Sequence, residues 1–356
     1  MDRVRVLFLP VVDVDNTNAQ SLNVREIARR LDPERFHSTL WYEHEPDPQL
    51  RNHAGIRLLQ LPSHGKTLRI LRELLAGYDI IAYVDYSPAT YLFLHLPRAV
   101  RRRAKAVFHA EAPSAQIMNP SRALRFLHDG IVPRCDFYTG ITEFVSQDVQ
   151  SHIKKTVSYI LPVGVDTRLF SPPPGRTNPV PVVLFAGTLV ERKGPQHVLA
   201  AAERFPSVTF RLVGAGRQGF SEVLQQRITQ SGLKNVKLDG PKTQLQMRDI
   251  MRESDIFILP SRLEGIPKVT LEAAATGLPC IVFRDYLSPS VIDDVTGFQV
   301  GTPQDMMRAL GRLIEDRSLR ERMGAAARKH MESFDWELVS RQWQRAYVEI
   351  SAMPAR

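Results

Sequence analysis

Short apolar segments alternate along the chain with segments whose apolar positions follow a helical period. The apolar segments are near-continuous runs of Val, Ile, Leu and Phe, which indicate strands buried on both faces, as in a parallel sheet covered by helices. They lie at residues 4–12, 79–84, 106–108, 180–186, 208–213, 256–259 and 280–283. Helical patterns lie at residues 21–31, 196–204 and 220–231. This alternation predicts an α/β fold of the doubly wound class.

The alternation is interrupted at residues 161–180, which hold five prolines and two glycines. Such a composition does not sustain a helix or a strand and predicts an interdomain linker. The linker divides the chain into two halves of similar size, each long enough for a Rossmann-like domain. A cleft between two such domains is a common ligand site.

Composition excludes several classes of protein. The 356 residues are 43% apolar and 24% charged, as in globular proteins, which argues against a disordered or fibrous chain. The two cysteines, Cys135 and Cys280, are too few for a disulfide framework or a structural zinc site. No apolar run reaches the ~18 residues of a membrane-spanning helix. Acidic residues directly after the apolar run 6–12 argue against a signal peptide, so we expect a cytoplasmic protein.

The chain is basic, with 47 Lys and Arg against 38 Asp and Glu, a formal charge of +9. This balance suits anionic partners such as nucleotides, nucleic acids or anionic lipid surfaces. The segment Arg98–Lys105 holds five basic residues and no acidic one. It is compatible with a contact to phosphates or to a membrane surface, and equally with a solvated helix face.

The segment 254–279 carries the first candidate site. A buried strand at 256–259 is followed by a loop that contains Glu264, Gly265 and Ile266, and Pro267 suits the first position of a helix. Open α/β sheets bind ligands at the carboxyl ends of their strands, and free N–H groups at a helix start bind anions. Lys268 opposes the helix dipole unless an anion binds there, although it can also be a plain surface lysine.

The segment 182–195 carries the second candidate site. A predicted strand ends at Gly187, and a short loop then presents Arg192 and Lys193 before Gly194 and a helix. Arginine can form a bidentate contact with phosphate, and lysine supplies a compact positive charge. Two adjacent cations in a loop are common, so this segment by itself is a moderate signal.

Together the two segments resemble the family-4 retaining glycosyltransferases of the GT-B fold. Glu264 and Glu272 match the family's E-x(7)-E motif, and Arg192-Lys193-Gly194 matches its phosphate-binding cations. Residues 162–170 and 334–336 resemble the family's linker and the start of its final helix. The resemblance covers about residues 160–350. It implies two Rossmann-like domains that face each other across a cleft.

The resemblance also implies a role for each domain. Residues 1–162 would be the acceptor-binding domain, with a final helix at about 337–356 packing back onto it, and residues 163–336 would bind the nucleotide-sugar donor. The donor site would consist of the following residues: Gly187, Thr188, Gly265, Ile266, Pro267, Lys268, Val269 and Glu272. Many family members have an arginine at the position of Thr188, and Arg192 would supply that charge here.

Within this site the resemblance implies that Glu272 binds the donor ribose and Glu264 the transferred sugar. Arg192 and Lys193 would neutralise the leaving diphosphate, and His109 would lie near the sugar. Glu272 can also be an ordinary helix glutamate, and His109 an ordinary histidine at a strand end. On the acceptor side, Asn16, Asn18 and Gln20 can bind hydroxyl groups or simply cap the loop.

The expected reaction is metal-independent transfer of a sugar from a nucleotide-diphosphate donor to a hydroxyl group, with retained configuration and no cofactor. The product would belong to cell-surface polysaccharide, lipopolysaccharide or glycolipid synthesis. The expected partners are the nucleotide-sugar and a glycan or lipid-linked acceptor, without nucleic acid. The segment Arg98–Lys105 would provide a peripheral contact at the inner membrane face.

Two other functions remain open from the residues. Gly214, Gly216 and Gly219 form a G-x-G-x-x-G turn, and Asp239 follows at the spacing of a dinucleotide site, so an NAD-dependent oxidoreductase is the main alternative. A basic nucleic-acid binder is the other, although the cations are dispersed and not interleaved with aromatic residues. The pair Asp13 and Asp15 imitates a metal-binding motif, but we expect no metal there.

Overall fold

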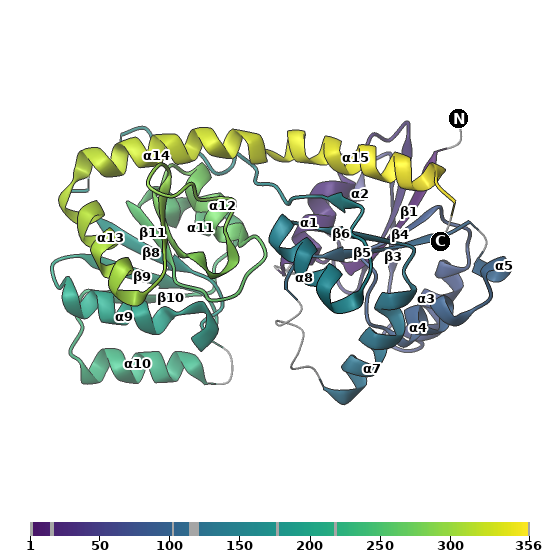
Figure 1. Ribbon diagram of the computed structural model, residues 1–356, viewed down its shortest axis with the longest axis horizontal. Helices are drawn as coiled ribbons and strands as arrows, with labels where there is room; N and C mark the ends of the chain where they lie inside the picture. Colours follow the sequence, from purple (N-terminus) through teal and green to yellow (C-terminus); the bar gives the residue numbers. More distant parts are fainter. Residues whose placement is uncertain are drawn as a thin grey trace. The chain divides into compact units, whose positions relative to one another are not determined.

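The computed structural model describes residues 3–14, 18–101, 103–113, 121–175, 178–216 and 219–354. Contacts between residues divide the chain into two compact units. Unit 1 comprises Met1–Val163 and Trp336–Arg356, and unit 2 comprises Gly164–Asp335. Each unit consists of one parallel sheet with helices packed against it (Figure 1). This confirms the predicted α/β class of the two Rossmann-like halves.

The sheet of unit 1 has seven strands in the order β3-β2-β1-β4-β5-β6-β7. The strands are β1 (Val4–Val11), β2 (Phe36–Tyr42), β3 (Ile56–Gln60), β4 (Ile80–Ala82), β5 (Lys105–Ala110), β6 (Phe137–Gly140) and β7 (Tyr159–Ile160). The helices are α1 (Ala19–Ala28), α2 (Pro48–Arg51), α3 (Lys66–Leu74), α4 (Pro88–His95), α5 (Arg98–Arg101), α7 (Arg122–Ile131), α8 (Glu143–Ile153) and α15 (Trp336–Ala352), with a 3-10 turn at η1 (Val132–Arg134). The order of strands reverses between β1 and β4, so loops leave these two neighbours in opposite directions.

The sheet of unit 2 has six strands in the order β10-β9-β8-β11-β12-β13. The strands are β8 (Val182–Ala186), β9 (Thr209–Val213), β10 (Val236–Gly240), β11 (Ile256–Leu259), β12 (Cys280–Phe283) and β13 (Gly297–Val300). The helices are α9 (Pro195–Arg204), α10 (Phe220–Gln230), α11 (Gln244–Arg252), α12 (Lys268–Ala275), α13 (Pro303–Glu315) and α14 (Arg317–Met331), with 3-10 turns at η2 (Glu191–Lys193), η3 (Arg284–Tyr286) and η4 (Glu332–Phe334). Here the order reverses between β8 and β11.

Burial explains the near-continuous apolar runs. All four residues of β11 and all four of β12 are buried, because helices cover both faces of the sheet. Helix α12 ends at Ala275, and Gly277 follows with a φ of +77°, which favours glycine. A β-carbon on Gly324 of α14 would lie only 2.3 Å from the Gly277 carbonyl oxygen, so α14 approaches the end of α12 closely.

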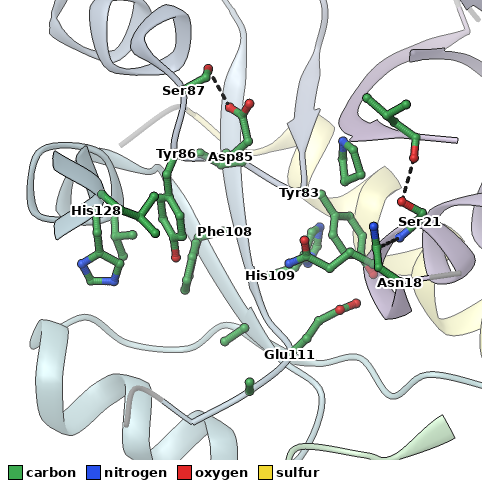
Figure 2. A pocket seen from close by; sticks show the side chains of 18 of the residues that line it. Asn18, Ser21, Tyr83, Asp85, Tyr86, Ser87, Phe108, His109, Glu111 and His128 are labelled. Carbon is green, nitrogen blue, oxygen red and sulfur yellow. Dashed lines mark hydrogen bonds between the residues drawn. The ribbon is translucent and has the colours of Figure 1, made fainter. Parts of the chain in front are cut away.

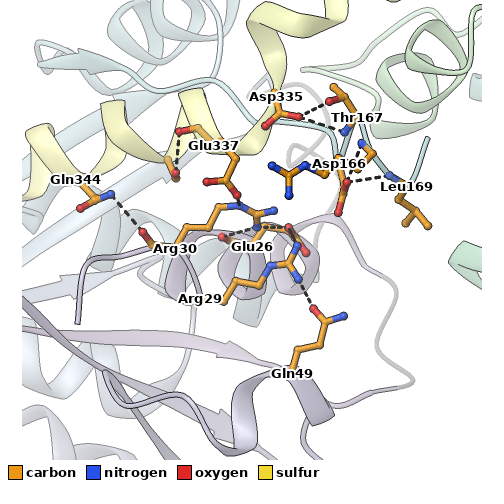
Figure 3. A network of polar contacts seen from close by, with 12 residues as sticks. Glu26, Arg29, Arg30, Gln49, Asp166, Thr167, Leu169, Asp335, Glu337 and Gln344 are labelled. Carbon is orange, nitrogen blue, oxygen red and sulfur yellow. Dashed lines mark hydrogen bonds and ion pairs between the residues drawn. The ribbon is translucent and has the colours of Figure 1, made fainter. Parts of the chain in front are cut away.

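The last helix, α15, packs onto unit 1. The Trp343 Nε1 atom donates a hydrogen bond to the Pro162 carbonyl oxygen at 2.9 Å. Gln344 donates to the carbonyl oxygen of Arg30 at 3.2 Å, and the Arg30 Nε atom lies 3.0 Å from Glu337 (Figure 3). These contacts attach α15 to Pro162 and to Arg30, which lies two residues after the end of α1.

Candidate functional site

The candidate site of unit 2 lies where the strand order reverses. Strands β8 and β11 are parallel neighbours, so their carboxyl ends share one edge of the sheet. The turn η2 follows β8, and the loop 260–267 follows β11. The carboxyl edge at such a reversal is where open α/β sheets bind ligands.

Two cations and one carboxylate meet at this edge. The Oε1 atom of Glu264 lies 2.8 Å from Lys193 Nζ and 3.1 Å from an Arg192 guanidinium nitrogen. The Ser261 hydroxyl donates to the same oxygen at 2.7 Å. The side chains of Glu264 and Lys193 are 9% and 16% exposed, against 39% for Arg192, so the lysine pair is the more shielded. The cluster carries one net positive charge.

Close backbone approach brings these loops together. A β-carbon on Gly194, whose φ is +77°, would lie 2.4 Å from the Pro260 carbonyl oxygen. Only glycine therefore lets η2 lie against the end of β11. The Arg192 guanidinium also donates to the Leu263 carbonyl oxygen. Gly187 lies beside the Lys193 side chain, since its β-carbon would be 3.5 Å from Cδ.

Helix α12 begins one residue later than predicted. Pro267 is the N-cap with a ψ of 116°, and Lys268 is the first helical residue. An extended Pro267 ends the loop, and no side chain caps the helix. Gly265 and Ile266 are buried before it, whereas Lys268 and Val269 are half-buried. Thr188, after β8, is also half-buried.

Glu272 lies one turn after Lys268 on α12 and is 8% exposed. Burial raises the pKa of Glu272 to about 7, although the positive charge of Lys268 acts in the opposite direction. This carboxyl group is therefore close to its titration point at neutral pH. A carboxyl group that is partly ionised at neutral pH can accept hydrogen bonds when a ligand binds.

Unit 1 contains a separate cavity of about 740 Å³. It lies at the carboxyl ends of β1, β4 and β5 (Figure 2). Of the residues predicted on the acceptor side, Asn18 and Gln20 line it, and Asn16 lies outside the described residues. Asn18 also caps α1, because its side-chain oxygen accepts from the Ser21 backbone at 2.8 Å. Both the binding and the capping interpretation of Asn18 are thus compatible with the structure.

His109 lines the same cavity and is 5% exposed. Its Nδ1 atom bonds the Thr139 hydroxyl, and its Nε2 atom lies 3.1 Å from the Tyr347 hydroxyl. Burial lowers the pKa of His109 to about 3. The ring is therefore neutral near pH 7, which suits hydrogen bonding and positioning rather than proton transfer.

Three polar residues at these edges were missed from the sequence. Ser261 binds Glu264, whereas Asp85 and Glu111 line the cavity of unit 1. Glu111 accepts a hydrogen bond from Asn23 at 2.6 Å, and burial raises the pKa of Asp85. Each of the three comes within three residues of the carboxyl end of a strand, and that position was the available signal.

The glycine turn after β9 has a packing role. A β-carbon on Gly214 would lie 1.9 Å from the Gly187 carbonyl oxygen, and one on Gly216 would lie 2.0 Å from the Ser221 hydroxyl. Asp239 pairs with Arg211 at 2.7 Å. These contacts account for the pattern that suggested a dinucleotide site. Residues 217 and 218 of the turn lie outside the described residues.

Of the acidic pair Asp13 and Asp15, only Asp13 lies within the described residues. Asp13 accepts hydrogen bonds from the backbone of Glu43 and His44, at 2.9 and 3.1 Å. In the described ranges, no three His, Cys, Asp or Glu side chains gather closely enough to hold a metal ion. None of the helices described there is both long and apolar enough to cross a membrane.

The basic segment Arg98–Lys105 is largely engaged within unit 1. Lys105 is buried and donates to the Ser351 carbonyl oxygen at 2.6 Å. Arg98 pairs with Asp136 at 3.4 Å, and Arg103 pairs with Asp79 at 3.0 Å. Arg102 lies outside the described residues. The charge of this segment is therefore less available to a partner than its sequence suggests.

A family model and several curated proteins match part of the chain. Residues 167–330 match the family described as "Glycosyl transferases group 1". A D-inositol 3-phosphate glycosyltransferase of Streptomyces griseus is 34% identical over 171 residues, which are 44% of this chain and 36% of that protein. A GDP-mannose-dependent monoacylated alpha-(1-6)-phosphatidylinositol monomannoside mannosyltransferase of Corynebacterium glutamicum is 31% identical over 204 residues, 50% of this chain and 53% of that protein. The chain thus spans about half or less of the length of these two relatives.

Solved structures match both units. HepE of Anabaena, in complex with UDP and glucose, has a TM-score of 0.78 at 18% identity and covers 98% of this chain and 100% of its own. Sucrose-phosphate synthase of Thermosynechococcus elongatus has a TM-score of 0.82 at 17% identity, with the same coverage. At this identity the matches establish the fold, which is the GT-B glycosyltransferase fold. The chain therefore has the GT-B fold, and its residues 167–330 match the family of glycosyl transferases group 1.

Proposed function

We propose that this protein moves a sugar from a nucleotide-diphosphate donor to a hydroxyl group of an acceptor, with retained configuration. Unit 2 binds the donor and unit 1 binds the acceptor. The observation that carries the proposal is the meeting of Lys193, Arg192 and Glu264 at the reversal of the unit 2 sheet. Two cations there suit a diphosphate, and a carboxylate beside them suits the hydroxyl groups of a sugar.

The chemical difficulty of the reaction is the departure of the diphosphate, which gains negative charge as the bond to the sugar breaks. Arg192 and Lys193 stabilise that charge more in the transition state than in the ground state. The backbone of Gly265–Val269 contributes N–H groups at the start of α12. Because these groups supply the positive charge, we expect transfer to proceed without a metal ion or a cofactor.

The remaining predicted residues have positioning roles in this proposal. Glu264 accepts hydrogen bonds from the transferred sugar, and Glu272 accepts them from the donor ribose. Gly187 and Thr188 leave room for the diphosphate beside Lys193. His109 holds a neutral ring at the acceptor side. The acceptor attacks from the face that the diphosphate leaves, and the departing phosphate helps to remove the proton of the acceptor hydroxyl.

A glycan or lipid-linked acceptor is proposed, for cell-surface polysaccharide, lipopolysaccharide or glycolipid synthesis. The phosphatidylinositol mannoside named for one relative supports the glycolipid case.

A membrane contact was predicted at Arg98–Lys105, but the neighbouring helices α3 and α7 support such a contact better. Leu68 of α3 and Phe126 of α7 are 73% and 62% exposed, and α4 packs against both helices. These two helices also carry basic residues, namely Lys66, Arg69, Arg72, Arg122 and Arg125.

Vesicle flotation tests this membrane contact. The protein is expected to float with phosphatidylglycerol vesicles and to stay behind with phosphatidylcholine vesicles. A Leu68→Glu, Phe126→Glu variant is expected to lose the binding, because two charges replace the exposed apolar side chains. Equal flotation of variant and wild type would assign the contact to another surface.

Nucleotide binding tests the main proposal. UDP, GDP or ADP is expected to raise the melting temperature of the full chain, because ligands that bind the folded state stabilise it. NAD is expected to have no effect. Transfer is then measured with the matching sugar nucleotide in the presence of EDTA. A shift with NAD and with none of the three diphosphates would favour the oxidoreductase instead.

A further inference from the structure

We infer that the cavity of unit 1 accepts a neutral, hydroxyl-rich group and discriminates against a phosphorylated one. The inference rests on the proposed glycosyl transfer and specifies the chemical class of its acceptor. It concerns the cavity of about 740 Å³ at the carboxyl ends of β1, β4 and β5 (Figure 2). An acceptor without phosphate would differ from the inositol 3-phosphate that the names of some relatives specify.

Four acidic side chains line this cavity, and burial raises the pKa of one of them, Asp85. The four are Asp13, Glu43, Asp85 and Glu111. Within the described residues, no lysine or arginine lines the cavity. Lys66 pairs with Glu43 at 2.7 Å, and the His44 ring lies 3.4 Å from the Asp13 carboxylate, but neither Lys66 nor His44 lines the cavity. The cavity is therefore acidic although the chain as a whole carries a charge of +9.

The two histidines of the lining do not reverse this charge. His109 is neutral near pH 7, because burial lowers its pKa to about 3. The Nδ1 atom of His128 lies 3.0 Å from the Asp129 carboxylate, so a positive charge on its ring would already be paired. A phosphate group in the cavity would thus find carboxylates and no lysine or arginine among the described lining residues.

The polar and aromatic lining suits a sugar or another polyol. Asn18, Gln20 and Ser87 present amide and hydroxyl groups, and carboxylates such as Glu111 accept hydrogen bonds from hydroxyls. Figure 2 shows Tyr86 and Phe108 on the side of the cavity away from Asn18. Apolar and aromatic walls with a few placed polar groups are typical of small-molecule sites. Such walls can contact the C–H faces of a sugar ring.

The two units differ in the charged residues at the carboxyl edge of their sheets. In unit 2 Arg192 and Lys193 lie at the carboxyl edge of the sheet, where the diphosphate of the donor is proposed to bind. In unit 1 the corresponding edge carries Asp85 after β4 and Glu111 after β5. Juxtaposed like charges oppose binding by an amount that grows as water is excluded. Each unit therefore selects a different charge class of ligand.

Matched pairs of small acceptors test the inference. The full chain is offered methyl glucoside, methyl mannoside, methyl galactoside and inositol, each beside its monophosphate, and binding is measured by saturation-transfer NMR. We expect the neutral member to bind at least about tenfold more tightly in each pair that binds, a difference of ~1.4 kcal/mol. Added salt is expected to strengthen binding of the phosphorylated member and to leave the neutral one unchanged, because ions screen the repulsion.

A charge-neutralising variant locates the effect. Glu111→Gln keeps the shape of the side chain and an oxygen that can accept from Asn23. It should reduce the gap in affinity between the neutral and the phosphorylated member of each pair. Glu34→Gln removes the same charge from an exposed position outside the cavity and should leave the gap unchanged. Preference for the phosphorylated member, or no binding of any neutral member, would overturn the inference. The nucleotide shifts described above are measured on the same sample, so failure of the proposed function is recognised separately.

Discussion

The Nζ atom of Lys193 lies 2.8 Å from the Oε1 atom of Glu264, the same oxygen that Arg192 contacts at 3.1 Å. In this structure the Glu264 carboxylate pairs with both of the cations that are proposed to bind the diphosphate. Glu264 thus has two consequences for the site. It holds the cations in place, and it competes with an incoming anion for their charge.

Lys193→Ala is expected to lower the rate of sugar transfer by about 10²–10³, because one preorganised positive group is lost at the leaving diphosphate. The measurement is kcat with the donor identified by thermal shift. Lys234→Ala removes an exposed lysine of the same unit and should have wild-type activity. A folded Lys193→Ala variant with wild-type turnover would refute the role proposed for this lysine.

Glu264→Gln is expected to tighten binding of free UDP or GDP by about threefold to tenfold, because the cations lose their competing anion. The amide can still accept the hydrogen bond from Ser261. Transfer should nevertheless fall, since the sugar loses a carboxylate partner. Calorimetric titration with the nucleotide measures the first effect, and Glu315→Gln, at an exposed site, is the control. Weaker nucleotide binding would show that Glu264 supports the diphosphate rather than competing with it.

Burial raises the pKa of Glu272 from its usual 4.5 to about 7. Between these values the folded state binds more protons than the unfolded state, so stability falls as the pH rises from 4.5 to 7. The loss is about 3 kcal/mol. Glu272→Gln should remove this pH dependence in urea unfolding curves. In the wild type, nucleotide affinity should increase over the same range, since the ribose hydroxyls donate to the ionised carboxylate; a flat profile would contradict this role.

The pKa of His109 is lowered by burial from 6.5 to about 3. Here the folded state binds fewer protons than the unfolded state, so stability falls as the pH drops below 6.5. Between pH 6.5 and about pH 4.5 the expected loss is about 3 kcal/mol. His109→Gln should be less stable than wild type at pH 7, with a difference that shrinks at the lower pH. His64→Gln, at an exposed site, should keep the wild-type profile.

Trp343→Phe is expected to destabilise unit 1 by about 1–3 kcal/mol, because the partly buried Pro162 carbonyl oxygen loses its donor. Trp41→Phe is a matched control. Trp41 is equally buried, but its Nε1 atom has no hydrogen-bond partner in the described structure. Urea unfolding should show a smaller loss for Trp41→Phe. Equal losses would mean that ring packing alone accounts for the effect.

Much of the fold could be predicted from local patterns. The apolar run 256–259 coincides with β11, and the run 180–186 contains β8. Both strands are buried on their two faces, so nearly every position is apolar and the signal is strong. Strand β2 was not predicted. It includes Ser38 and Thr39 and the half-buried His37 among its apolar residues, and only its place between β1 and β3 buries Ser38 and Thr39.

The start of α12 shows how local prediction loses accuracy at boundaries. Pro267 was expected at the first helical position because its missing N–H is harmless there. Its ψ of 116° makes it the N-cap instead. Proline is compatible with both positions, and the path of the preceding buried loop, Glu264–Ile266, decides between them.

The amino-acid sequence by itself determined the alternation of elements, the proline-rich division between two α/β units, and the spacing that links Glu264 to Glu272. These features depend on residues close together in the chain. The pairing of Lys193 with Glu264, the neutral ring of His109 and the acidic cavity at Glu111 were decided only by the tertiary structure. Each arises because parallel strands bring distant loops to one edge, where burial and neighbouring charges, rather than residue type, set the state of an ionisable group.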